Sequence, residues 1–144
     1  MSDHVNNDDR DIVGTAAIQL ANVVGADSVG TSRTRDKLPR CTELGLTHAV
    51  LVENGQFADA VKSVAPNGAN VILDTVGAAY LPQNVQVIAK QGRLIVIGLM
   101  GGVKGELNLG QLLGKRASIH GSVLRSRSRE EKARLTKSFS EEML

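Results

Sequence analysis

Residues 70–98, NVILDTVGAAYLPQNVQVIAKQGRLIVIG, decide the fold of this chain. The runs VILD at residues 71–74 and RLIVIG at residues 93–98 are almost continuously apolar, as expected for strands buried on both faces of a parallel sheet. The pattern between them predicts a helix over residues 79–90. A strand, a helix and a second strand form a right-handed crossover unit, so the stretch predicts an α/β fold with an open parallel sheet.

The same alternation continues on both sides of this stretch. Pro39 weakens the prediction for the first turn of the second helix. The other expected elements are an apolar helix from about Val13 that ends at Gly25, a strand over 28–31, a charged helix over 34–44, a strand over 49–52, a helix over 56–64, a short helix over 107–113, a strand from Ala117 to Val123 and a helix from about Ser128.

Composition limits the chain to one domain with an aliphatic core. The 144 residues are 42% hydrophobic and 22% charged, which is typical of a single folded domain. Aromatic residues make up only 2%, so platforms that stack nucleic-acid bases on several rings are excluded. The net charge of +2 is too small to indicate a polyanion partner by itself.

The N-terminal segment differs from the rest of the chain. Residues 1–11 are rich in Asp and Asn and lack apolar periodicity, so we expect a disordered acidic tail before a domain over residues 12–144. A single cysteine, Cys41, excludes an internal disulfide and favours a reducing compartment. With no apolar run near the roughly 18 residues that span a bilayer, we expect a cytoplasmic protein that does not enter membranes.

No residue is predicted to be catalytic or to bind a metal. The three histidines, His4, His48 and His120, lie far apart and in no metal-ligand spacing. Cys41 on a helix is better explained as a small packing residue than as a nucleophile.

Ligand-binding signals lie instead where strands end. Val13-Gly14 is all that remains of a glycine-rich phosphate turn, and an ordinary helix start explains it better. Residues 31–37, TSRTRDK, place hydroxyls and cations where NAD-specific sites carry a carboxylate, which favours a 2′-phosphate; a solvated first helical turn is an equal alternative. Gly77 and Gly98 follow buried strands, at the edge where α/β sheets bind ligands, although simple turns explain them nearly as well.

Taken together, these segments resemble one family. The runs LDTVG (73–77), GLMGG (98–102) and HGSVLRSRS (120–128) are similar to the nucleotide-binding domain of zeta-crystallin-like NADPH:quinone oxidoreductases, which belong to the zinc-free branch of the medium-chain dehydrogenase/reductase superfamily. The resemblance covers about nine tenths of the chain. It implies a Rossmann-like doubly wound parallel sheet, here lacking its first strand, that binds NADPH for hydride transfer to quinones or α,β-unsaturated carbonyl compounds.

The resemblance also implies a cofactor site and a partner. It matches Val13 and Gly14 with the end of the glycine turn, Thr34 and Lys37 with the 2′-phosphate contacts, and Gly77 with the cofactor cleft. It matches Gly98, Leu99 and Met100 with the nicotinamide-side loop, and Ser122 and Leu124 with the strand end beneath that loop. It further implies a homodimer that joins two sheets at the strand from Ala117 to Val123.

Three departures from the family pattern limit the expected activity. The first strand and the earlier glycines are replaced by the acidic tail, Val52 stands where the family often has a tyrosine, and the GroES-like substrate domain is absent. We therefore expect a truncated cofactor domain that is inactive alone. One alternative is a non-enzymatic remnant that self-associates through its sheet edge, and a weaker one is polyanion binding through the basic residues of the stretch 116–134.

Overall fold

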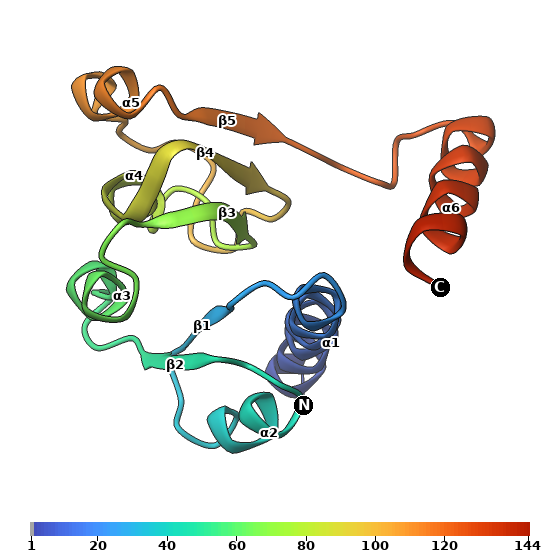
Figure 1. Cartoon of the computed structure of the whole chain (residues 1–144), viewed down its shortest axis with the longest axis horizontal. Coiled ribbons are helices and arrows are strands. Elements are labelled where there is room, and N and C mark those ends of the chain that lie inside the picture. Colours follow the sequence, from blue (N-terminus) through green and yellow to red (C-terminus); the bar gives the residue numbers. More distant parts are fainter. Residues whose placement is uncertain (1) are drawn as a thin grey trace.

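The computed structural model describes the backbone of residues 2–144 and the side chains of residues 13–144. Six helices and five strands alternate along most of this part of the chain (Figure 1). In chain order they are α1 (Ser2–Val23), β1 (Val29–Ser32), α2 (Leu38–Glu43), β2 (His48–Leu51), α3 (Ala58–Val64), β3 (Ala69–Asp74), α4 (Leu81–Val87), β4 (Ile88–Val96), α5 (Leu109–Lys115), β5 (Ser118–Gly121) and α6 (Arg129–Met143). None of the helices in this range is long and apolar enough to cross a bilayer.

All five strands lie in parallel sheets, which confirms the predicted α/β class. One sheet holds β1 and β2, with Gly30 opposite Ala49. The other has the order β3-β4-β5, with Leu94 between Ile72 and Ile119. The single sheet expected from the sequence is therefore split between β1 and β3. In the described residues no strand precedes β1 along the chain, so none is available to join the two sheets.

Several element boundaries differ from the predicted ones. The first helix begins at Ser2, where a disordered tail was expected; residues 2–13 hold no Pro or Gly that would interrupt a helix. α2 begins only at Leu38, because Pro39 is tolerated in a first turn but not in a helix interior. α4 ends at Val87 and not at residue 90, because Ile88 already pairs with Ala69 of β3.

The core lies around β2, α3 and α4. Its buried members are aliphatic apart from one ring, as the composition predicted: Val50, Val52, Phe57, Ala58, Val61 and Val87. Ile72 of β3 packs against this cluster, and Leu94 of the central strand is completely buried. The Lys115 ammonium at the end of α5 donates to the Val85 and Gln86 carbonyls (2.8 and 2.7 Å), which ties α5 to the end of α4.

Candidate functional site

The carboxyl end of β3 is shaped by a buried aspartate. The Asp74 carboxylate accepts hydrogen bonds from the Val76 and Gly77 amides at 2.9 and 2.8 Å, and its side chain is almost fully buried. Gly77 has a φ of 84°, a left-handed conformation that glycine adopts without strain. Asp74 thus folds the chain sharply at the edge where parallel sheets bind ligands. The sequence pattern singled out the run 73–77 but did not assign Asp74 this role.

The loop after β4 packs tightly on this turn. The Gly101 amide donates to the Val76 carbonyl at 2.7 Å, and the Ala78 amide donates to the Gly102 carbonyl at 3.1 Å. A Cβ atom on Gly98 would lie 2.6 Å from the Thr75 carbonyl oxygen, and one on Gly77 would lie 2.8 Å from the Gly102 carbonyl oxygen. A side chain at either position would clash with the backbone of the other loop, so the contact between the two loops requires glycine at both.

Tyr80, at the start of α4, contacts the segment between β2 and α3. Its ring meets the Phe57 ring edge-on, with a centroid separation of 4.8 Å. Burial raises the pKa of Tyr80 above its ordinary value of 10.0; the Arg33 guanidinium, which follows β1, lowers it in part, and the Asp74 carboxylate adds to the increase. Residues after β1 and β2 and the last residue of β3 thus all influence Tyr80. The sequence analysis missed this residue.

We expect the Tyr80 phenol to titrate above its ordinary range, and Arg33→Ala to raise its pKa further by removing a stabilising cation. Because the chain has one tyrosine and no tryptophan, phenolate absorbance reports this group alone. The unfolded phenol loses its proton first, so the free energy of unfolding should fall as the pH rises above about 10. Arg35→Ala is the control; an unchanged pKa in Arg33→Ala would contradict the arrangement.

Gln83 fixes the loop between β2 and α3. Its Oε1 accepts from the Phe57 and Ala58 amides at 2.7 and 3.0 Å, and its Nε2 donates to the Gly55 carbonyl. The side chain is buried, so these bonds hold Phe57 under the Tyr80 ring without competition from water.

The predicted 2′-phosphate residues lie after β1. The Ser32 hydroxyl accepts from the Thr34 amide at 3.2 Å and donates to the Thr34 carbonyl at 2.8 Å, which curls residues 32–34 into a turn. Thr34 is exposed, and Lys37 is half-buried at the start of α2. Arg33 is exposed beside them.

Val13 and Gly14 do not form a turn at a helix start. Both lie inside α1, more than ten residues after its beginning at Ser2. The amides of a helix interior donate to carbonyls of the preceding turn, so those of Val13 and Gly14 are not free to bind a phosphate. A Cβ atom on Gly14 would meet nothing within 4 Å. This differs from the glycine turn that the resemblance implied.

The remaining predicted residues lie after β4 and β5. Leu99 and Met100 are 49% and 54% exposed and offer apolar surface next to Gly77. The Ser122 hydroxyl accepts from Arg127 at 3.1 Å, and Leu124 is 57% exposed. The structure thus brings Gly77, Gly98 and Leu99 together, and it places Ser122 and Leu124 after a different strand.

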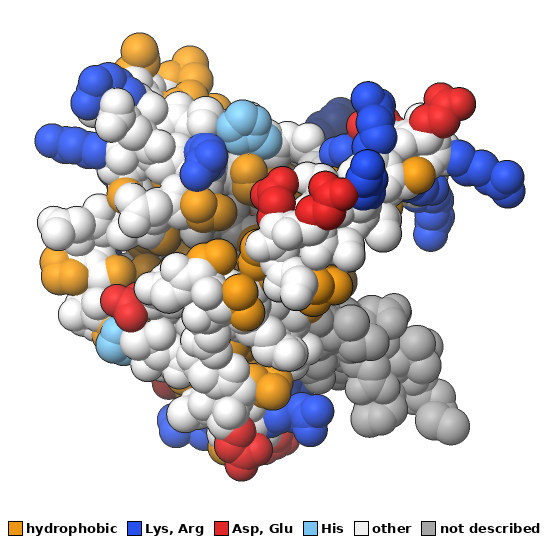
Figure 2. All heavy atoms as spheres, turned by 45° about the vertical axis from the view of Figure 1, so that its right-hand side comes forward, with side chains coloured by type: hydrophobic (Ala, Val, Ile, Leu, Met, Phe, Trp, Pro, Cys, Tyr) orange, Lys and Arg blue, Asp and Glu red, His pale blue; other side chains and the backbone are white. Residues whose placement is uncertain are grey.

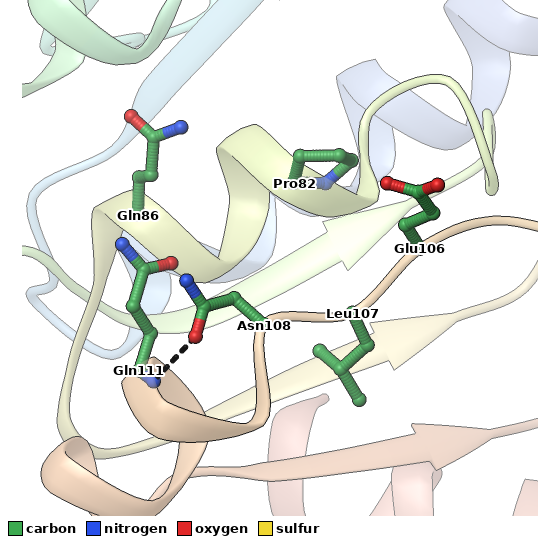
Figure 3. Close-up of a pocket in the computed structure, with 6 residues that line it drawn as sticks. All are labelled: Pro82, Gln86, Glu106, Leu107, Asn108 and Gln111. Atoms are coloured by element: carbon green, nitrogen blue, oxygen red, sulfur yellow. Dashed lines mark hydrogen bonds between the residues drawn. The ribbon is translucent and has the colours of Figure 1, made fainter.

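Two shallow hollows lie away from these residues. One, of about 320 Å³, lies between α4 and the segment that enters α5; its lining residues are Pro82, Gln86, Glu106, Leu107, Asn108 and Gln111 (Figure 3). There the Asn108 carboxamide oxygen accepts from the Gln111 amide, so it caps α5. The other, of about 440 Å³, lies beside the loop after β2 and the first residues of α3. None of the ten predicted site residues lines either hollow.

Comparison with known proteins places the chain among dehydrogenases and reductases. A family model described as zinc-binding dehydrogenase matches residues 13–141. The quinone oxidoreductase-like protein 2 homolog of Nematostella vectensis is 34% identical over 111 residues, which cover 76% of this chain and 30% of that protein. Prostaglandin reductase-3 of Mus musculus is 28% identical over 120 residues, covering 77% and 32%. The chain spans about a third of the length of these curated relatives.

A solved structure shares the fold. The crystal structure of an NAD-dependent alcohol dehydrogenase superposes with a TM-score of 0.72 at 28% identity, over 89% of this chain and 37% of that one. Although the family's name refers to zinc, the described part of this chain contains no group of three His, Cys, Asp or Glu side chains able to hold a metal ion. The residues described here therefore do not fit a zinc site.

Proposed function

The chain belongs to the zinc-binding dehydrogenase family, and we propose that it is the dinucleotide-binding domain of an NADPH-dependent oxidoreductase. In the whole protein, the reduced nicotinamide supplies a hydride to quinones or other α,β-unsaturated carbonyl compounds. Relatives named quinone oxidoreductase-like protein 2 and prostaglandin reductase-3 support this substrate class.

The observation that carries the choice of NADPH is the turn after β1. Ser32 holds residues 32–34 in a curl that leaves Arg33 and Thr34 exposed, with Lys37 at the start of α2. No carboxylate is present at residues 31–35, where an NAD-specific site would carry one for the ribose 2′-hydroxyl. A hydroxyl and cations at this point suit a 2′-phosphate.

The two ends of a dinucleotide fit unequally. The 2′-phosphate end suits Thr34 and Lys37. The exposed Leu99 and Met100 suit the nicotinamide side, in the loop that packs on Gly77. The pyrophosphate does not fit, since α1 runs continuously through Val13 and Gly14. We therefore propose weak binding that depends on the 2′-phosphate, and we derive no hydride-transfer step.

The test uses adenosine 2′,5′-bisphosphate and adenosine 5′-monophosphate, which differ by the 2′-phosphate alone. Lys37→Ala should weaken binding of the bisphosphate about tenfold, the size of one charge-assisted hydrogen bond, and leave binding of the monophosphate unchanged. Lys90→Ala, an exposed lysine on β4, is the matched control. Equal affinity of the wild-type chain for both nucleotides, measured by calorimetric titration, would contradict the proposal.

A second candidate role is self-association through β5. This strand lies at the edge of its sheet, and all four of its residues are exposed. Nothing in the strand blocks pairing by a second chain, since it holds no proline and no Lys, Arg, Asp or Glu. Ile119→Pro removes a backbone donor, and we expect it to abolish a dimer that sedimentation detects for the wild type. A wild type that stays monomeric at high micromolar concentration would exclude this role.

A further inference from the structure

One face of the three-stranded sheet is uncovered. Residues paired in register share a face, so Ile72, Leu94 and Ile119 lie together on one side. That side is covered by α4 and α5, and Leu94 is fully buried there. On the opposite side Val71 is 55% and Leu73 is 46% exposed.

We call this second side the open face; its exposed members are Val71, Leu73, Arg93, Ser118 and His120, with Ile97 directly after β4. Parallel sheets bury both faces in nearly all known folds. Apolar side chains at the ends of β3 and β4 therefore predict that another element lies against them.

The last helix of the same chain has no extensive contact with the other described elements. α6 packs extensively against no other element of residues 2–144 and extends beyond the carboxyl ends of the strands (Figure 1). Leu135 and Phe139, four residues apart and so on one side of the helix, are 50% and 41% exposed. Figure 2 shows α6 projecting from the body of the molecule, with most of its surface formed by charged side chains.

A network around Arg127 joins α6 to the connector that precedes it. The Arg127 guanidinium donates to the Val123 carbonyl at 2.9 Å, to the Ser122 hydroxyl at 3.1 Å and to the Glu131 carboxylate at 3.0 Å. Lys132 adds a bond to the Arg125 carbonyl at 3.3 Å. These bonds join the connector to the first turn of α6, and the helix that they hold lies apart from β3 and β4 of its own chain (Figure 1).

The open face and α6 also have complementary charges. The open face carries Arg93 among its apolar residues. On α6, Glu142 lies three residues after Phe139 and seven after Leu135, which places it on the same side of the helix. A helix seated by Leu135 and Phe139 thus brings a carboxylate to a face that holds a guanidinium.

We propose that α6 docks on the open face of a second copy of this chain, in a twofold exchange in which each copy covers the other. The Arg127 network remains intact in this arrangement, and both unpartnered apolar surfaces are buried. Exchange of one element between identical chains is a common route to dimers. The proposal stands independently of nucleotide binding and of pairing at β5, which β4 separates from β3.

Cysteine cross-linking tests the exchange directly. In a Cys41→Ser background, one chain carries Leu73→Cys and a size-tagged chain carries Phe139→Cys. Mild oxidation of the mixture should give a disulfide-linked heterodimer as the main product. Lys137→Cys is the control, because Lys137 lies on the other side of α6 with its side chain 77% exposed; it should cross-link at least about fivefold less, since its thiol points away from the proposed contact.

Three results would overturn the proposal. A chain carrying both Leu73→Cys and Phe139→Cys would form an internal disulfide as its main product if α6 covers its own sheet. Absence of any cross-link above the Lys137→Cys level would show that α6 docks on neither. As an independent measurement, replacing both Leu135 and Phe139 with Gln should weaken the dimer at least about tenfold by sedimentation, because two apolar side chains lose their burial. Lys137→Gln should leave it unchanged, and equal effects would also overturn the proposal.

Discussion

Leu94→Ala is expected to lower the free energy of unfolding by about 2–5 kcal/mol, the range for a large aliphatic residue truncated in a packed core. Leu94 is 0% exposed and lies on the central strand, between Ile72 of β3 and Ile119 of β5. Its side chain points to the side that α4 and α5 cover, so the removed atoms leave a cavity between sheet and helices.

Urea unfolding followed by circular dichroism measures this loss. Leu113→Ala on α5 is the matched control, because Leu113 is 75% exposed and its truncation should change the free energy of unfolding by less than about 0.5 kcal/mol. Equal effects of the two substitutions would contradict the placement of the core under β4.

Gln83→Leu is expected to lower the free energy of unfolding by about 2–4 kcal/mol, since each buried donor left without an acceptor costs about 1–3 kcal/mol. The substitution keeps the size of the side chain but removes the oxygen that accepts from the Phe57 and Ala58 amides. It also removes the donor to the Gly55 carbonyl. Phe57, which packs under Tyr80, would lose its position.

Gln86→Leu is the control for this substitution. Gln86 lies three residues further along α4, is half-buried and accepts from neither amide. Its replacement should shift the urea midpoint little, by less than about 0.5 kcal/mol in free energy. If Gln83→Leu behaved like Gln86→Leu, the loop at residues 55–58 would not depend on the Gln83 carboxamide.

Much of the fold was predictable because apolar runs mark buried parallel strands. The runs at 71–74 and 93–98 correspond to β3 and β4, and the strand expected from Ala117 to Val123 contains β5 at the predicted edge. The split between β1 and β3 was not foreseen, because pairing between strands depends on partners far along the chain and not on local pattern. Helix starts were also misplaced where the pattern offered no interruption, as in residues 2–13.

The candidate site was predictable only in part. Gly77 and Gly98 lie at strand ends as expected, since the carboxyl ends of parallel strands share one edge. The ring contact of Tyr80 with Phe57 and the effect of the Arg33 charge on the pKa of its phenol join residues from three different segments, and local pattern carries no signal for them. The sequence pattern likewise gave no sign that Gln83 is buried and holds the loop after β2 through its carboxamide.

We propose that this chain holds a dinucleotide through its 2′-phosphate, and a comparison of NADPH with NADH isolates the contribution of that group. Calorimetric titration of the wild-type chain with each dinucleotide should show weak but measurable binding of NADPH and at least about tenfold weaker binding of NADH, because only NADPH carries a 2′-phosphate for Arg33, Thr34 and Lys37. NADH binding as tightly as NADPH, or binding of neither dinucleotide at millimolar concentration, would contradict the account.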